Sequence, residues 1–200
     1  MDIGSLFASE IQYEEELVMG LKLKLKPRDS GQLDTEMHLT LWPSAEKLCS
    51  LIPTLIPPTS SILELGAGTG LVGLFTAKTF PGSTVLITDG NTESVDLIQE
   101  NIEANSLNAR SSHFLWGESA GSFDVILGSD VIYDKDFIHP LLRTISLSLN
   151  SHGFSILANH TIRFNPLQRL FFEVAARVGL EVETIESNPI YIVRLTLKSN

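Results

Sequence analysis

Three alternating glycines follow directly on a short apolar run, and this segment limits the possible fold more than any other part of the chain. Residues 62–70 read ILELGAGTG. Because glycine has no Cβ, Gly66, Gly68 and Gly70 allow tight turns with positive φ and a close approach of the backbone to a ligand. The apolar run after Gly70 predicts a helix, whose N-terminus directs amide hydrogens and partial positive charge at the loop. The segment therefore predicts a strand–loop–helix unit that binds a nucleoside-like ligand carrying a carboxylate or a phosphate.

An acidic residue at the end of the next apolar run indicates a ribose site. Asp89 follows residues 84–88 and lies 89 − 68 = 21 positions after Gly68. An acid about 20 residues beyond such glycines is placed to bind ribose hydroxyls at the end of the neighbouring strand.

Two cofactors are compatible with these glycines. Gly68, Gly70 and Gly73 satisfy the dinucleotide pattern G-x-G-x-x-G, so NAD is the alternative. We favour S-adenosylmethionine, because Glu64 and Gly66 both precede the dinucleotide match and have no role in it.

From residue 62 onward the pattern alternates between strands and helices, which is typical of a parallel sheet covered on both faces. The expected strands are residues 62–65, 84–88, 112–116, 123–128 and 154–158, and the expected helices are residues 44–55, 71–77, 92–106, 136–149 and 166–178. Two final strands, residues 180–185 and 190–197, have a link so short that it allows only an antiparallel hairpin. We predict an α/β fold: a Rossmann-like, mostly parallel sheet with helices on both faces and an antiparallel C-terminal hairpin.

The N-terminal region predicts a second hairpin. Residues 18–26 alternate between apolar and basic side chains, a turn follows at residues 27–31, and residues 33–41 are the expected partner strand. Lys22, Lys24 and Lys26 would protect the edge of this sheet; a basic docking patch is the alternative. We expect one domain, with residues 1–40 as an N-terminal β-hairpin extension and residues 41–200 as the core.

In an open parallel sheet the ligand lies beyond the carboxyl ends of the strands. The polar and aromatic residues expected at those ends, besides the glycine loop, are Asp89, Asn91, Trp116, Ser129, Asp130 and Tyr133. Trp116 is suited to stacking on an adenine ring. Asp130 is suited either to the reaction or to capping the helix that follows it.

Composition excludes several other classes of protein. The net charge of −10 argues against nucleic acid as a partner. A single cysteine, Cys49, excludes an internal disulfide and a cysteine-rich zinc site, and the five histidines lack metal-ligand spacing, so we expect no metal. Without a signal-peptide pattern or a long apolar segment, we expect a monomer in the cytoplasm, with entry into the nucleus left open, and no membrane association.

Six segments together resemble a known family. They are LTLWPSAEKL (39–48), ILELGAGTGLVGL (62–74), ITDGN (87–91), ENIEAN (100–105), LWG (115–117) and SDVIYD (129–134). In these segments the chain resembles the class I, or seven-β-strand, S-adenosylmethionine-dependent methyltransferases. Within that class it resembles the lysine methyltransferases that act on folded non-histone proteins such as calmodulin, Hsp70 and valosin-containing protein. Residues 1–37 match no segment of the family.

The resemblance implies roles for individual residues. It implies that Asp130 and Tyr133, which form the D-x-x-Y motif, are required for activity and belong to the lysine site. The cofactor contacts implied by the resemblance or by the glycine segment are Trp42, Glu64, Gly66, Ala67, Gly68, Gly70, Asp89, Asn91, Trp116 and Ser129. Ser129 departs from the alanine common in the group. The implied function is methyl transfer to a lysine of a protein substrate; the alternatives are an arginine, histidine or small-molecule acceptor, or a cofactor-binding protein without catalysis.

Overall fold

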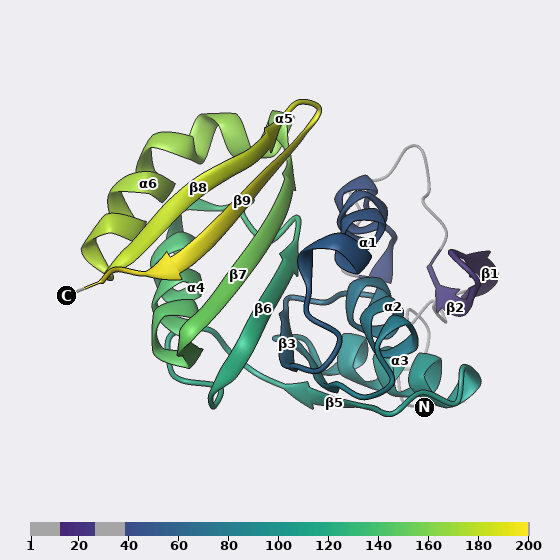
Figure 1. Cartoon of the computed structure of the whole chain (residues 1–200). Coiled ribbons are helices and arrows are strands. Elements are labelled where there is room, and N and C mark those ends of the chain that lie inside the picture. The colour runs from purple at the N-terminus through teal and green to yellow at the C-terminus, as the bar shows by residue number, and fades with distance from the viewer. Residues whose placement is uncertain (1–12, 27–38, 200) are drawn as a thin grey trace, which may run out of the picture.

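A computed structural model describes residues 13–26 and 39–199. Its centre is a seven-stranded sheet in the order β5-β4-β3-β6-β7-β9-β8 (Figure 1). The strands are β3 (Ser61–Leu65), β4 (Thr84–Asp89), β5 (Ala109–His113), β6 (Phe123–Ser129), β7 (Leu149–His160), β8 (Leu180–Ser187) and β9 (Ile190–Leu197). The five strands from β5 to β7 run parallel, whereas β9 pairs antiparallel with both β7 and β8. The predicted fold class is confirmed.

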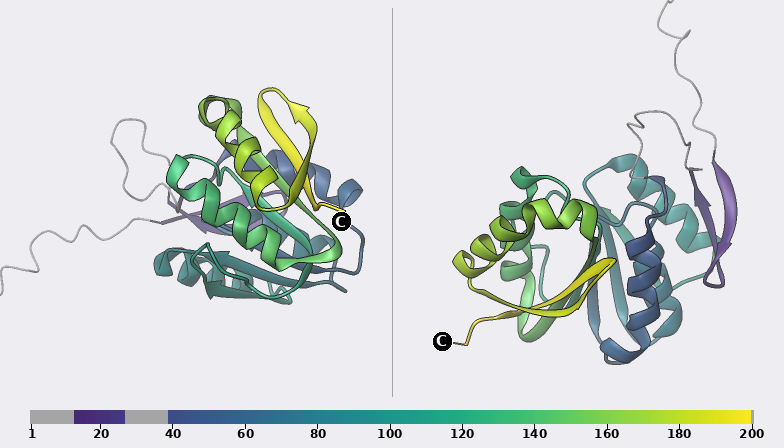
Figure 2. Two further views of the ribbon diagram at one scale, coloured as in Figure 1. Left: turned by 90° about the vertical axis from the view of Figure 1, so that its left-hand side faces the viewer. Right: turned by 90° about the horizontal axis from the view of Figure 1, so that it is seen from above.

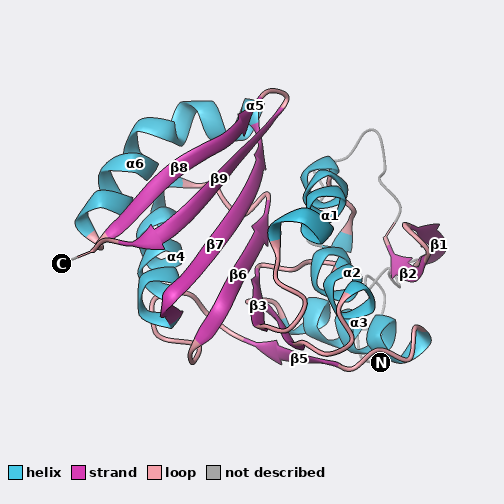
Figure 3. Cartoon of the chain, in the orientation of Figure 1, coloured by secondary structure: helices cyan, strands magenta, loops and turns pink. Residues whose placement is uncertain are grey.

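Helices cover both faces of this sheet, as Figure 2 shows. In Figure 3 the helices are cyan and the strands magenta. On one face lie α1 (Pro43–Leu55), α2 (Leu71–Thr79) and α3 (Thr92–Ala104), and on the other lie α4 (Lys135–Ser148) and α6 (Gln168–Arg177). The short helix α5 (Thr161–Phe164) and a 3-10 turn (Asn165–Leu167) lead from β7 to α6. Neighbouring strand residues divide between the faces: Ile62 packs towards α1 and α2, and Leu63 towards α4. This alternation is the period-two pattern of a strand that is buried on both sides.

One strand begins earlier than the sequence indicated. The expected strand at residues 112–116 is β5, Ala109–His113, which lies at the edge of the sheet and pairs with β4 alone. Its ARSSH sequence is polar because an edge strand needs no apolar face towards water. The apolar residues that suggested a strand, Phe114 to Trp116, instead form the loop that follows it.

The N-terminal hairpin is confirmed, but its partner strand was predicted wrongly. β2 (Leu21–Leu25) pairs antiparallel with β1 (Glu14–Val18) through a turn at Met19 and Gly20, whose φ values are 50° and 78°. Positive φ at both central residues suits the right-handed twist of a two-residue hairpin. Of the expected partner, residues 33–38 lie outside the described part of the chain, and residues 39–41 are not a strand.

Asn101 of α3 and Asn105, the C-cap residue of that helix, bond to the outer edge of β2. The amide group of Asn105 bonds both backbone groups of Lys22 (2.9 and 2.7 Å), and that of Asn101 bonds both backbone groups of Lys24 (2.7 and 3.0 Å). Four residues of helix advance by about 6 Å and two residues of strand by about 6.6 Å, so the two spacings match. Asn101 also donates to the carbonyl of Thr69 in the glycine loop (3.2 Å). The hairpin is thereby tied to that loop.

Within the described residues, no helix is both long enough and apolar enough to cross a membrane.

Candidate active site

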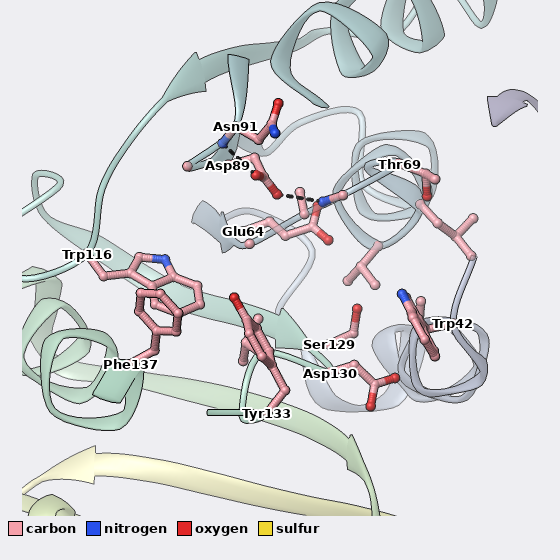
Figure 4. A pocket seen from close by; sticks show the side chains of 18 of the residues that line it. Trp42, Glu64, Thr69, Asp89, Asn91, Trp116, Ser129, Asp130, Tyr133 and Phe137 are labelled. Carbon is pink, nitrogen blue, oxygen red and sulfur yellow. Dashed lines mark hydrogen bonds between the residues drawn. The ribbon is translucent and has the colours of Figure 1, made fainter. Parts of the chain in front are cut away.

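A cavity of about 670 Å³ opens at the carboxyl ends of the central strands (Figure 4). This volume is within the ordinary range for sites that bind small molecules and cofactors. Every site residue predicted from the sequence lines it except Gly70; the lining includes Trp42, Glu64, Gly66, Ala67, Gly68, Asp89, Asn91, Trp116, Ser129, Asp130 and Tyr133. The fold thus brings the predicted residues together, while their contacts with a cofactor stay a prediction.

The glycine loop has the left-handed backbone that its sequence requires. The φ values are 62° at Gly66, 57° at Gly68 and 82° at Gly70. A Cβ on Gly66 would come within 2.9 Å of both Trp116 and Val131, so a side chain there would push into the cavity wall. Gly70 acts elsewhere: it is the N-cap residue of α2 and directs the chain into that helix.

Asp89 anchors the loop to the end of β4. Its Oδ2 accepts from the backbone amide of Gly68 (2.8 Å) and its Oδ1 from that of Asn91 (2.9 Å). Asn91 in turn caps α3 through a bond from the amide of Glu93 (2.8 Å). Since a carboxylate oxygen can accept more than one hydrogen bond, Asp89 can still receive hydroxyl groups from a ligand.

Glu64 is fully buried beneath the loop. Its Oε2 accepts from the backbone amide of Gly73 in α2 (2.7 Å), while its Oε1 has no hydrogen-bond partner among the described residues. A Cβ on Gly73 would lie only 2.6 Å from Oε2, so this close approach requires glycine. Burial raises the pKa of Glu64 to about 8, because a buried carboxylate loses its hydration. The side chain supports the helix that follows the loop.

Asp130 lies on the opposite wall, in a left-handed backbone conformation with a φ of 53°. Its Oδ1 accepts from the backbone amide of His160 (2.9 Å) and pairs with Nη2 of Arg163 (3.0 Å). Its Oδ2 is buried and has no hydrogen-bond partner in the part of the chain that the structure describes. The following helix, α4, is capped by Asp134, so the alternative role of Asp130 as its cap is wrong.

Three aromatic side chains form one side of the cavity. The ring centroids of Tyr133 and Phe137 are 5.8 Å apart, and those of Phe137 and Trp116 are 6.0 Å apart in an edge-to-face arrangement, as Figure 4 shows. Tyr133 is 53% exposed and Phe137 45%, so this side reaches the molecular surface. Partial burial raises the pKa of the Tyr133 phenol. Aromatic faces exposed in this way attract a cation.

The sequence did not identify Arg163 and Phe137. Arg163 lies on α5, directly after β7, and its guanidinium carbon is 3.9 Å from the ring centroid of Trp42. The rule that selects residues at the carboxyl ends of strands would have found Arg163, had it been applied to the fifth strand. Phe137 follows Tyr133 by four positions, in the first turn of α4, and only the structure shows that it faces the cavity.

Within residues 13–26 and 39–199, the structure contains no group of three or more acidic, histidine or cysteine side chains that could hold a metal ion. Cys49 is buried in α1, and burial raises the pKa of its thiol.

Comparison with known proteins gives this arrangement a family context. The model of a family described as lysine methyltransferase matches residues 28–177. Calmodulin-lysine N-methyltransferase of Arabidopsis thaliana is 35% identical over 138 residues, which cover 62% of this chain and 44% of the plant protein. Protein N-lysine methyltransferase METTL21A of Xenopus tropicalis is 35% identical over 150 residues, which cover 68% of each chain. The chain therefore spans less than half the length of the Arabidopsis protein.

Solved structures share the fold at low sequence identity. A methyltransferase from Pyrococcus furiosus has a TM-score of 0.65 and 21% identity, over 89% of this chain and 90% of that one. The 16S rRNA methyltransferase RsmC of T. thermophilus has a TM-score of 0.65 and 19% identity, over 94% of this chain and 50% of that one.

Proposed function

Since the chain belongs to the lysine methyltransferase family, we propose that it transfers methyl groups from S-adenosylmethionine to a lysine of a folded non-histone protein. The observation that carries this proposal is that the glycine loop and the D-x-x-Y motif, Asp130 to Tyr133, line one and the same cavity. A cofactor site and an acceptor site are therefore continuous, as a direct transfer requires.

The glycine-loop wall fits the cofactor. At Gly66 and Gly68 the absence of side chains lets the cofactor come close to the loop backbone. Asp89 would bind the ribose, and Trp116 and Asn91 would contact the adenine. The cofactor supplies a methyl group on a positively charged sulfur, which a neutral amine can attack. The protein has only to position the amine and to remove its proton.

The opposite wall fits an ammonium group. The pKa of a lysine side chain is about 10.4, so its deprotonation at pH 7 costs about 4.6 kcal/mol. Oδ2 of Asp130, which has no partner among the described residues, can accept a hydrogen bond from the ammonium, and Tyr133 and Phe137 offer aromatic faces beside it. Asp130 would thus orient the lysine, and the proton would leave through Asp130 or to water.

The geometry favours lysine over arginine as the acceptor. A guanidinium is bound best by two carboxylate oxygens at once. Asp130 has only one oxygen without a partner among the described residues, because Arg163 and His160 occupy the other.

The other parts of the proposal concern the setting of the enzyme. We propose a monomer that acts in the cytoplasm without a nucleic-acid partner, with residues 1–40 as an extension of one methyltransferase domain. The net charge of −10 supports the absence of nucleic acid. The shared hydrophobic cluster of Leu21, Leu23 and Leu25 with α1, α2 and α3 supports a single domain.

The test is to incubate the protein with S-adenosylmethionine carrying a deuterated methyl group and a cell extract, and to locate the label by mass spectrometry. We expect the label on lysine side chains of folded proteins, and we expect it to disappear when Asp130→Asn replaces the wild type. Label confined to arginine, histidine or small molecules would contradict the proposal, and so would efficient labelling of free histone tails.

A further inference from the structure

The charges on the cavity wall are unevenly distributed. Three acids, Glu64, Asp89 and Asp130, line the cavity. Of the described lining residues, Arg163 alone carries a positive charge. The sequence and the family motifs assign no role to this arginine. An anionic group that enters the cavity would meet repulsion at Asp89 and Asp130 and attraction at Arg163. Glu64 contributes little to this repulsion, because burial raises its pKa to about 8.

Contacts with Asp130 and Trp42 hold the side chain of Arg163 in place. Its side chain is 25% exposed, its Nη2 pairs with Oδ1 of Asp130 at 3.0 Å, and its guanidinium lies over the ring of Trp42. A guanidinium has five N–H donors in a fixed plane, so the bond to Asp130 leaves others for a ligand. Stacking on Trp42 fixes the plane in which those donors lie.

We propose that Arg163 binds the α-carboxylate at the amino-acid end of S-adenosylmethionine. This carboxylate is the cofactor's one anionic group, and a planar guanidinium matches its two oxygens. The inference rests on the proposed function for the choice of cofactor.

The assignment also gives the cofactor a direction in the cavity. Figure 4 shows Asp89 and Asn91 on one side of the cavity and Trp42 and Asp130 on another. With the ribose at Asp89 and the carboxylate at Arg163, the nucleoside part and the amino-acid end of the cofactor are held apart. The predicted contact of Trp42 with the cofactor then acts through Arg163, which Trp42 orients.

The experiment compares two ligands by calorimetry: S-adenosylmethionine and its decarboxylated form, which lacks only the α-carboxylate. We expect the wild type to bind S-adenosylmethionine about 10- to 100-fold more tightly than the decarboxylated form, the usual range for a hydrogen-bonded charged group. In Arg163→Met this ratio should fall to about threefold or less. The ratio of the two affinities is compared within each variant, because partial unfolding weakens the binding of both ligands alike.

Arg194→Met is the matched control. Arg194 also lies over an aromatic ring, 4.2 Å from the centroid of Phe154, but it does not line the cavity. This variant should keep the wild-type ratio. Arg163→Lys keeps the charge next to Asp130 but loses the planar donors, so it should give an intermediate ratio. It tests the proposal if Arg163→Met does not fold.

Two failures can be told apart. If the wild type binds neither ligand, the proposed function is contradicted, and this inference with it. If the wild type prefers S-adenosylmethionine and both Arg163 variants keep the same preference, only the assignment of Arg163 is overturned. A wild type that binds the two ligands equally would likewise overturn it.

Discussion

The two walls of the cavity use their carboxylates differently. On the glycine-loop wall, both oxygens of Asp89 and one oxygen of Glu64 accept from backbone amides. On the opposite wall, Oδ1 of Asp130 accepts from the backbone amide of His160 and also pairs with the side chain of Arg163. Oδ2 of Asp130, like Oε1 of Glu64, has no partner among the described residues. The carboxylates of the first wall are bonded by backbone amides, whereas the second wall also contains an ion pair between two side chains. We infer that the first wall holds the cofactor and that the second also handles charge.

The difference between the walls follows from how each is assembled. The glycine-loop wall comes from one short segment and the end of the next strand, so its bonds form within a single β-α-β unit. The opposite wall brings together Trp42 at the start of α1, Asp130 after β6 and Arg163 after β7. Substitutions can therefore separate the two walls.

The largest expected effect on cofactor affinity is on the glycine-loop wall. Gly66→Ala should raise the Kd for S-adenosylhomocysteine at least about tenfold, because the new Cβ would lie 2.9 Å from Trp116 and Val131 at a φ of 62°. Gly179→Ala is the matched control: it has a φ of 81° and nothing within 4 Å of its Cβ position. Calorimetry should show a Kd within about twofold of wild type for the control. Equal losses in both variants would mean that backbone strain, not cavity shape, is responsible.

A pH effect tests the burial of Glu64 on the same wall. Its pKa is raised from 4.5 to about 8 in the folded protein, so its contribution to stability is complete below 4.5 and is lost as the pH rises through 8. Without cofactor, the melting temperature of the wild type should fall between pH 5 and 9 relative to that of Glu64→Gln. The glutamine keeps an acceptor for Gly73. Parallel melting curves for the two proteins would show that Glu64 does not titrate in this range.

A smaller effect concerns the support of the glycine loop by the N-terminal hairpin. Asn101→Ala removes bonds to both Lys24 and Thr69, whereas Asn105→Ala removes the equivalent bonds to Lys22 without touching the loop. We expect Asn101→Ala to raise the Kd for S-adenosylhomocysteine by about three- to tenfold and Asn105→Ala to leave it within about twofold. If calorimetry gives both variants the same affinity, the hairpin does not influence the cofactor wall.

The smallest effect is expected away from both walls. Lys24 forms an exposed ion pair with Glu100, and exposed pairs contribute little. Replacing Lys22, Lys24 and Lys26 by glutamate should therefore change the KM for the protein substrate by no more than about twofold. Steady-state kinetics on the labelled acceptor would check this. A much larger KM would show that the lysines form a docking patch.

The sequence predicted the glycine-loop wall almost completely because that wall is local. Gly66 and Asp89 lie at strand ends that short motifs define. The fold class also followed, since the alternation of strands and helices leaves few arrangements other than a parallel sheet.

Other features were out of reach because they carry little apolar pattern. β1 is Glu14–Val18, of which only Val18 is buried, so no alternation marked it as the partner of β2. β5 is polar for the same reason at the sheet edge. The position of Arg163 after the fifth strand could have marked it as a site residue, but its contacts with Trp42 and Asp130, which lie far from it in the sequence, could not be predicted from local spacing.

The central claim is that Asp130 serves the acceptor, whereas the cofactor is held by the glycine-loop wall together with Arg163. The most direct test measures two quantities for Asp130→Asn, which keeps an oxygen for the amide of His160: the Kd for S-adenosylhomocysteine and the rate of methyl transfer to the identified lysine. We predict a Kd within about threefold of wild type and a transfer rate at least about 100-fold lower, as expected for the loss of a positioned charged group. A near-normal rate, or a loss of cofactor affinity as large as the loss of rate, would contradict the division of roles between the two walls.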